Sequence, residues 1–251
     1  MGRIYDRHKN FIRLKWDASF AKQIMDVLFV ESRYAKTIKI PRSFIEKLPD
    51  HVTLFTTVQF LDSLESIQSQ LEHSGITVDI ITSRRTGREG QILGCSTTNK
   101  LSDDAVYIGD GEFHPKALLI RNDITVHAYD PISGQQRTFT QEDIASIRKR
   151  LNGMYAKFLS SPTIGIMVST KYGQNKRKFV DILKKEFPDK SWYVLADDTF
   201  DFSSLKDFSF LDMFVNTSCE RIGLDDMTSR EIPLINAEDL LDIARGKFDR
   251  T

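Results

Sequence analysis

The sequence has few cysteines, since its 251 residues include only Cys95 and Cys219. A secreted disulfide framework normally has more cysteines in a shorter chain. The first residues also lack a signal peptide, because they are basic and contain no apolar stretch of the kind that precedes a cleavage site. We therefore expect the protein in a reducing compartment, the cytoplasm, with a single disulfide between the two cysteines as the alternative.

Glycine, proline and net charge are also low. The chain has 13 glycines and 7 prolines, too few for a collagen-like or low-complexity protein. Its 35 basic and 35 acidic side chains cancel, so net charge gives no support for a nucleic-acid or membrane-surface role. No apolar run approaches the ~18 residues of a membrane span. Hydrophobic residues make up 40% of the chain, enough for the core of a globular protein of one or two domains.

Short apolar runs, rich in β-branched and aromatic residues, predict strands along most of the chain. These runs lie at 27–32, 52–57, 78–82, 106–108, 124–129, 164–169, 192–196 and 213–216. Near-continuous apolar runs of this kind are typical of parallel sheets that are covered on both faces. Apolar residues at helical spacing predict helices at 59–73, 140–158 and 174–187, the first ended by Gly75 and the second capped by Thr140 and Asp143.

The order strand, polar turn, helix, strand occurs twice, at 54–82 and at 166–196. Each stretch is followed by a small-residue turn with a cysteine, LGCS at 93–96 and NTSC at 216–219. We therefore predict an α/β protein with two Rossmann-like, three-layer domains that have mainly parallel sheets and are related by internal duplication. The alternative is that strand–helix–strand units resemble one another through physics alone.

The predicted division follows from this repeat. Residues 1–24 form an atypical basic N-terminal segment with no clear strand. Residues 25–145 form an α/β domain that carries Cys95, and residues 146–251 form an α/β domain that carries Cys219. The Ser-Ser-Pro sequence at 160–162 is the expected hinge.

The two cysteines are the first candidates for chemistry. A thiolate is a soft ligand that suits zinc or an iron–sulfur cluster, and both cysteines follow strand–helix units, where parallel-sheet proteins place their sites. No Cys-x-x-Cys pair is present, so the usual zinc-ribbon and cluster-binding spacings are missing. The alternative is that both are buried core thiols.

Polar turns supply the other candidates. In YIGDGEFHP (107–115), Gly109 allows close backbone approach to a ligand, and Asp110 and His114 offer acid, base and hydrogen-bonding groups. In STKYGQ (169–174), which ends at Gln174, backbone amides at a helix start favour an anionic group. In CERIGLDD (219–226), Arg221 can clamp a carboxylate. Ordinary solvated turns are the alternative for all three.

Six segments occur in one order: QILGCS (91–96), YIGDGEFHP (107–115), AYDP (128–131), STKYGQ (169–174), NTSCERIGLDD (216–226) and PLINAEDLL (233–241). Together they resemble the diphthamide biosynthesis enzymes, the 2-(3-amino-3-carboxypropyl)histidine synthase family, over residues 25–245. Each segment is weak alone, whereas six in this order, with both cysteines at family positions, make a specific match.

The resemblance implies three similar α/β domains, each of which donates one cysteine to a [4Fe-4S] cluster. It implies that S-adenosyl-L-methionine is cleaved there, with an electron donor, and that its 3-amino-3-carboxypropyl group goes to a histidine of translation elongation factor 2. The resemblance assigns Cys95 and Cys219 as the cluster ligands. From the positions of the motifs, we expect Gly109, Asp110 and His114 to line the cofactor side and Gln174 and Arg221 to hold the polar groups of S-adenosylmethionine.

The sequence departs from this family in having two cysteines where the catalytic members have three, and residues 1–24 do not resemble the first domain. It is either a truncated enzyme or a short form that needs a partner chain, as a homodimer or with a related subunit. A non-catalytic companion subunit is the second hypothesis. A metal-free Rossmann-like nucleotide binder is the third, although GxGxxG and GxxxxGK[ST] are absent.

Overall fold

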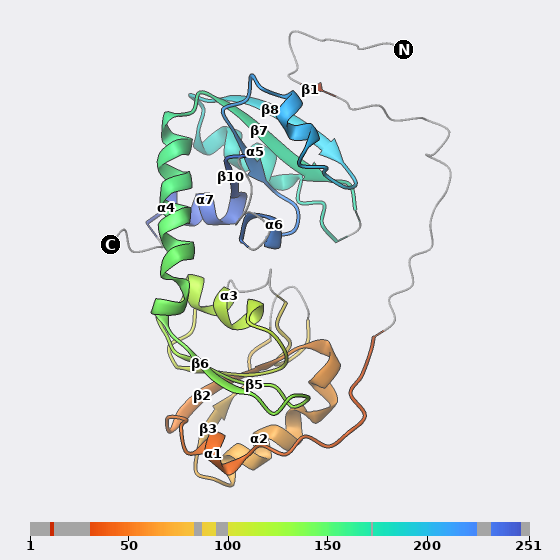
Figure 1. Cartoon of the computed structure of the whole chain (residues 1–251), viewed down its shortest axis with the longest axis vertical. Helices are drawn as coiled ribbons and strands as arrows, with labels where there is room; N and C mark the ends of the chain where they lie inside the picture. Colours follow the sequence, from red (N-terminus) through yellow and green to blue (C-terminus); the bar gives the residue numbers. More distant parts are fainter. Residues whose placement is uncertain are drawn as a thin grey trace. The chain divides into compact units, whose positions relative to one another are not determined.

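The computed structural model describes residues 11–12, 31–82, 87–93, 100–171, 173–224 and 232–246. It divides into two compact α/β units, one formed by residues 27–148 and the other by residues 149–251 together with the N-terminal segment that contains β1 (Phe11–Ile12) (Figure 1). The division falls inside helix α4 (Ala145–Ser160), between Arg148 and Lys149. Each unit is described by itself below.

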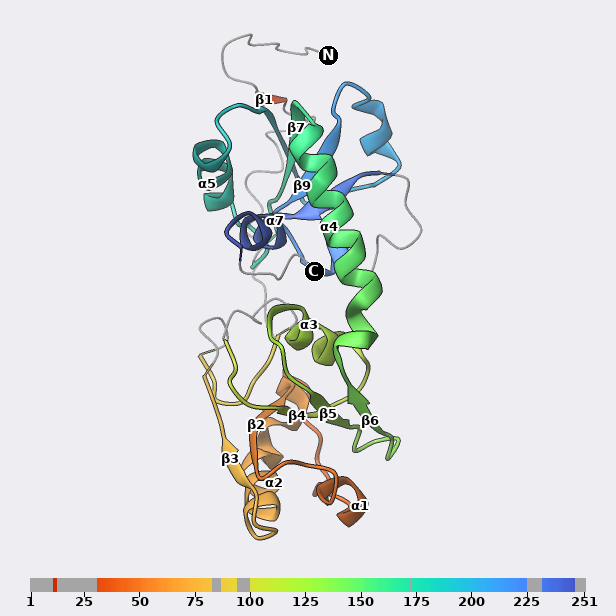
Figure 2. The ribbon, with the colours of Figure 1, turned by 90° about the vertical axis from the view of Figure 1, so that its left-hand side faces the viewer.

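The unit of residues 27–148 has a five-stranded sheet in the order β3-β2-β4-β5-β6. Its elements are α1 (Arg42–Ile45), β2 (His51–Thr56), the 3-10 helix η2 (Val58–Ser63), α2 (Leu64–Glu72), β3 (Thr77–Asp79), β4 (Ala105–Ile108), α3 (Phe113–Arg121), β5 (Val126–Tyr129), β6 (Gln136–Phe139) and the 3-10 helix η3 (Gln141–Ile144). All pairings are parallel except that of β5 with β6. Helices α2 and α3 cover opposite sides of this sheet (Figures 1 and 2).

The unit of residues 149–251 has a second five-stranded sheet, in the order β1-β8-β7-β9-β10. Its elements after α4 are β7 (Thr163–Ser169), α5 (Lys178–Glu186), β8 (Ser191–Asp197), the 3-10 helix η4 (Ser204–Asp207), β9 (Met213–Asn216), α6 (Arg221–Leu224), β10 (Leu234–Asn236) and α7 (Ala237–Ala244). Every pairing in this sheet is parallel. Figure 2 shows α5 and the connection with η4 on opposite sides of it.

The two sheets repeat one topology. In the first sheet β2 lies between β3 and β4, and β5 follows β4; in the second, β7 lies between β8 and β9, and β10 follows β9. Helices α2 and α5 connect the first two strands in each. This confirms the predicted α/β class with two mainly parallel sheets, and the shared strand order supports duplication.

Most predicted elements are present, because their apolar runs fill the core of a sheet. Val52, Val106 and Ile166 are completely buried in β2, β4 and β7. The expected cap is also present: Thr140 and Asp143 form a reciprocal capping box, although the first turn is η3 and the α-helix begins at Ala145. Within the described residues, no helix combines the length and apolar character that a membrane span requires.

The sequence analysis was wrong or incomplete at several elements. The strand predicted at 27–32 lies mostly outside the described residues, and Glu31 and Ser32 form no strand. A short strand, β1, lies within the segment expected to have none. The elements that were not predicted are α1, α3, β6, η4, α6, β10 and α7. Strand β6 is a polar, half-exposed edge strand, so its sequence QRTF lacks the apolar signal of the others.

Candidate functional site

Two equivalent loops lie at the carboxyl edges of the two sheets. Residues 109–112 connect β4 to α3, and residues 217–220 connect β9 to α6. Because β4 and β9 hold the same place in their sheets, these loops occupy the same position in the repeated topology. The carboxyl edge of a parallel sheet is where open α/β folds bind ligands, and both loops come from motifs that the sequence analysis selected.

Cys219 lies in the second loop as a half-buried free thiol. The backbone N–H and the hydroxyl of Thr217 both donate to the carbonyl of Met167 in β7, at 3.0 and 2.8 Å. Asn216, the last residue of β9, accepts a hydrogen bond from the Ser218 N–H and donates one to the Cys219 carbonyl at 2.9 Å. The loop is therefore attached to two neighbouring strands on both sides of the thiol.

A second amide supports the same loop. Asn236, at the end of β10, donates from Nδ2 to the Glu220 carbonyl at 3.0 Å, and its Oδ1 accepts from Asn216 at 2.8 Å. Gly223 permits this arrangement, since a Cβ at that position would lie 2.4 Å from Asn236 Oδ1. The Ser218 hydroxyl is buried and has no hydrogen-bond partner among the described residues. A buried polar atom without a partner is uncommon, and here it lies beside a thiol.

A group of charged side chains, one of them from the loop itself, lies largely buried. The Lys176 ammonium is 2.9 Å from Glu220 Oε1 and 3.0 Å from Glu238 Oε1. Lys176 precedes α5 and Glu238 lies in the first turn of α7, so the group joins three connections of the sheet. Burial raises the pKa of Glu220 to about 7, with the Glu238 carboxylate adding to the effect and the Lys176 ammonium opposing it.

The other predicted residues of this unit are at the surface. Gln174 is half-buried in the turn before α5, where its N–H donates to the Lys171 carbonyl at 3.1 Å. Arg221 is exposed at the start of α6, two residues after Cys219. Cys219 and Arg221 are thus close in the chain, whereas Asp225 and Asp226 are outside the described residues.

The loop of residues 109–112 is supported by a completely buried tyrosine. The Tyr107 hydroxyl donates to the Asp110 carbonyl at 3.1 Å and lies 3.2 Å from His114 Nδ1. The rings of Tyr107 and His114 stack with centroids 5.6 Å apart. Burial, assisted by the charges of Asp110 and Asp130, raises the pKa of Tyr107 well above its ordinary range, so the hydroxyl keeps its proton. Gly109, Asp110 and His114 therefore do lie together.

Gly109 is buried, and a Cβ there would lie 2.4 Å from the Tyr107 hydroxyl oxygen. Close approach of the Tyr107 side chain is sufficient to explain this glycine. The Asp110 side chain is exposed, and His114 is half-buried in the first turn of α3.

Cys95 lies outside the described residues. Gln91, in the same motif, pairs with Thr56 at the carboxyl end of β2, so the motif begins at the same sheet edge as residues 109–112. In chain order Cys95 precedes β4, whereas Cys219 follows β9.

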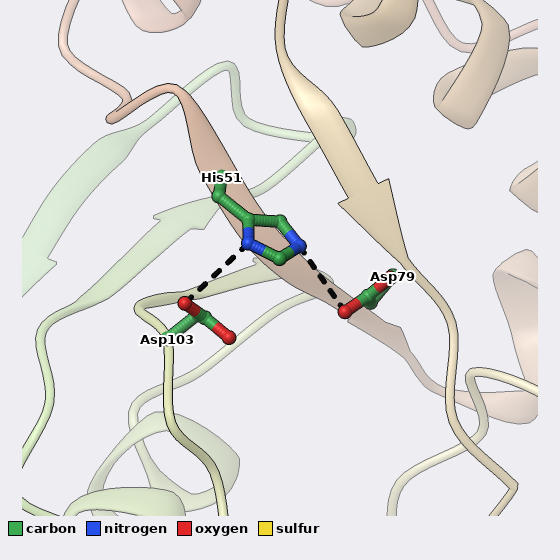
Figure 3. A group of neighbouring side chains, drawn as sticks. All are labelled: His51, Asp79 and Asp103. Atoms are coloured by element: carbon green, nitrogen blue, oxygen red, sulfur yellow. Dashed lines mark hydrogen bonds and ion pairs between the residues drawn. The ribbon is translucent and has the colours of Figure 1, made fainter.

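The sequence analysis did not single out a group at the opposite end of the first sheet. Figure 3 shows His51, the first residue of β2, with its ring between Asp79 and Asp103. Its Nε2 is 3.1 Å from Asp79 and its Nδ1 is 3.5 Å from Asp103. One ligand atom from each residue lies within 4.8 Å of the others, as in a metal site. Each ring nitrogen lies near a carboxylate oxygen, so the contacts within the group use the same atoms that would bind a metal ion.

The repeated sheets and the loop with Cys219 define a duplicated α/β protein with a thiol at the carboxyl edge of a parallel sheet. The family model for putative diphthamide synthesis proteins matches residues 18–246. The chain belongs to this family, which confirms the resemblance carried by its motifs.

Named relatives agree with this assignment. The chain is 29% identical to 2-(3-amino-3-carboxypropyl)histidine synthase subunit 1 of Yarrowia lipolytica, over 67% of this chain and 40% of that protein. It is 28% identical to 2-(3-amino-3-carboxypropyl)histidine synthase of Pyrococcus horikoshii, over 78% of this chain and 58% of that protein. The chain thus spans about half the length of these relatives.

The fold is also similar to that of a solved structure, Dph2 from Pyrococcus horikoshii with a 4Fe-4S cluster. The TM-score is 0.67 at 26% sequence identity, and the match covers 83% of this chain and 61% of that one. A second structure of Dph2 from the same organism gives a TM-score of 0.70 at 25% identity.

Proposed function

We propose that this chain is part of an enzyme that transfers the 3-amino-3-carboxypropyl group of S-adenosylmethionine to a histidine of translation elongation factor 2, the first step of diphthamide biosynthesis. The observation that best supports this proposal is a free, half-buried thiol on an anchored loop at a sheet edge, in a chain of this family. A Dph2 structure of similar fold carries a 4Fe-4S cluster.

The residues around Cys219 fit an iron–sulfur cluster. Thiolate is the ligand that such clusters use, and the buried Ser218 hydroxyl is a hydrogen-bond donor without a partner among the described residues. Cys219 and Cys95 would hold the cluster, and hydrogen bonds to sulfur tune its potential. When bound, a [4Fe-4S] cluster supplies the electron for cleavage of the Cγ–S bond of S-adenosylmethionine.

The remaining proposed roles belong to residues that bind and orient. The Arg221 guanidinium suits the carboxylate of S-adenosylmethionine, because it can donate two parallel hydrogen bonds. Gln174 would hold another polar group of the same molecule. Gly109, Asp110 and His114 would line the cofactor side, with the Tyr107 hydroxyl fixing the Asp110 backbone and the His114 ring.

The number of cysteines bears on partners. A catalytic cluster of this type needs three protein thiolates and one open iron, and this chain has two cysteines. We propose that a related chain can supply the third thiolate, and that an electron donor serves the complex in the cytoplasm. The same cysteine count favours a second candidate function, a non-catalytic companion subunit that binds an active partner.

The test is transfer of label from S-adenosylmethionine, labelled in its aminocarboxypropyl group, to elongation factor 2 under anaerobic reducing conditions. We expect no transfer by the chain alone, and transfer when a related chain with the missing cysteine is added. Loss of that transfer in Cys219→Ser supports the enzyme. Full transfer with both Cys95→Ser and Cys219→Ser would favour the companion role.

A further inference from the structure

The strongest unexplained feature beside the site is the buried lysine before α5. The side chain of Lys176 is 8% exposed and that of Glu220 is 5% exposed, and their charged atoms are 2.9 Å apart. The ammonium also contacts Glu238, whose side chain is 18% exposed. Burying a lysine with two carboxyl groups is costly, and close mutual pairing such as this offsets part of the cost.

The position of the group relates it to the thiol. Glu220 follows Cys219 directly, and the two residues are the last of the loop between β9 and α6. The carbonyls of both residues are held by side-chain amides, that of Cys219 by Asn216 and that of Glu220 by Asn236. The Lys176 contact attaches a side chain of the loop itself, that of Glu220, to the segment before α5.

We infer that Lys176 is a positioning residue for Cys219, acting through Glu220. The inference rests on the proposed role of Cys219 as a cluster ligand. Without the ammonium, Glu220 and Glu238 lose the cation that contacts both of them, and the Glu220 side chain loses its contact with the segment before α5. Glu220 then shifts from its position, and because it is adjacent to Cys219 in the chain, the shift displaces the thiol.

Hydrogen exchange measured by mass spectrometry on the full chain tests this inference. In Lys176→Met, we expect the amides of residues 217–224 to exchange at least about tenfold faster relative to those of β8. Lys190→Met is the matched control, because it also removes a buried lysine. The Lys190 side chain is 7% exposed, lies directly before β8 and donates to the Leu159 carbonyl of α4. We expect it to leave the relative exchange of 217–224 within about twofold of the wild type.

If Lys176→Met does not fold, Glu220→Gln takes its place, since an amide keeps the shape and weakens the contact. We then expect exchange of 217–224 to rise about threefold. Exchange within about twofold of the wild type, or an equal rise in β8, would overturn the inference for whichever variant is measured.

A second arm connects the loop to its ligand. After reconstitution with iron and sulfide beside a related chain, a chelator should remove iron about tenfold faster from Lys176→Met than from the wild type or Lys190→Met. Equal release would overturn the positioning role while leaving the proposed function intact. Failure of the wild type to take up iron would count against the proposed function. The exchange experiment would still decide whether Lys176 holds residues 217–224 in place.

Discussion

The Nζ atom of Lys176 lies 2.9 Å from Oε1 of Glu220, between residues that are 44 positions apart in the chain. The contact ties the connection after β7 to the loop after β9, and the loop carries Cys219. Removing one partner of a buried ion pair lowers the free energy of unfolding much more than replacing both partners by apolar side chains.

The stability of two variants should show this asymmetry. Lys176→Met should lower the free energy of unfolding by about 3–5 kcal/mol, because it removes one partner of a buried ion pair. Lys176→Met combined with Glu220→Met should recover most of that loss, since both partners of the pair are then replaced by apolar side chains. Chemical denaturation of the wild type and the single and double variants measures both values. A double variant that is less stable than Lys176→Met would contradict the account.

Two glycine substitutions should have opposite effects. Gly109→Ala places a Cβ 2.4 Å from the buried Tyr107 hydroxyl and should cost about 1–3 kcal/mol. Gly153→Ala is the control, because Gly153 lies inside α4 with open space where its Cβ would be, and alanine there should add about 0.5–1 kcal/mol. Thermal or chemical unfolding compares the two. Equal stability of both variants would argue against close packing of Tyr107 on Gly109.

His127 in β5 should make part of the stability depend on pH. Burial lowers its pKa below the ordinary value of 6.5, with Asp104 opposing the shift and Lys47 adding to it. The unfolded chain therefore takes up this proton at a higher pH than the folded protein, and stability falls as the pH drops below about 6.5. Between pH values of about 7 and 5, the wild type should lose more stability than His127→Gln. Parallel losses would show that His127 does not contribute.

Much of the fold could be predicted because its signal is local. The strands at the centre of each sheet are continuous apolar runs, and the cap at Thr140 is a spacing of three residues. Strand β6 could not be found this way, since it is a polar edge strand. Helix α7 could have been found, because its buried Ala237, Leu240 and Leu241 follow helical spacing.

The site was predictable only in part, for a related reason. Motifs led to the loops after β4 and β9, and to Cys219 within the second. They did not indicate Lys176, Glu220 or Glu238 as a group, since nothing local pairs a lysine with carboxylates so distant in sequence. Tyr107 was missed because a buried tyrosine in a strand is most often core, and its hydrogen bonds to the next loop depend on the tertiary fold.

The central claim is that Cys219, together with Cys95, holds an iron–sulfur cluster. The most direct measurement is iron and sulfide content after anaerobic reconstitution of the chain with a related chain that carries the third cysteine. The account predicts about four iron atoms per assembled site for the wild type and for Lys190→Met, with most of this iron lost in Cys219→Ser and in Cys95→Ser. It predicts little iron on the chain alone. Serine variants that hold as much iron as the wild type would contradict the claim.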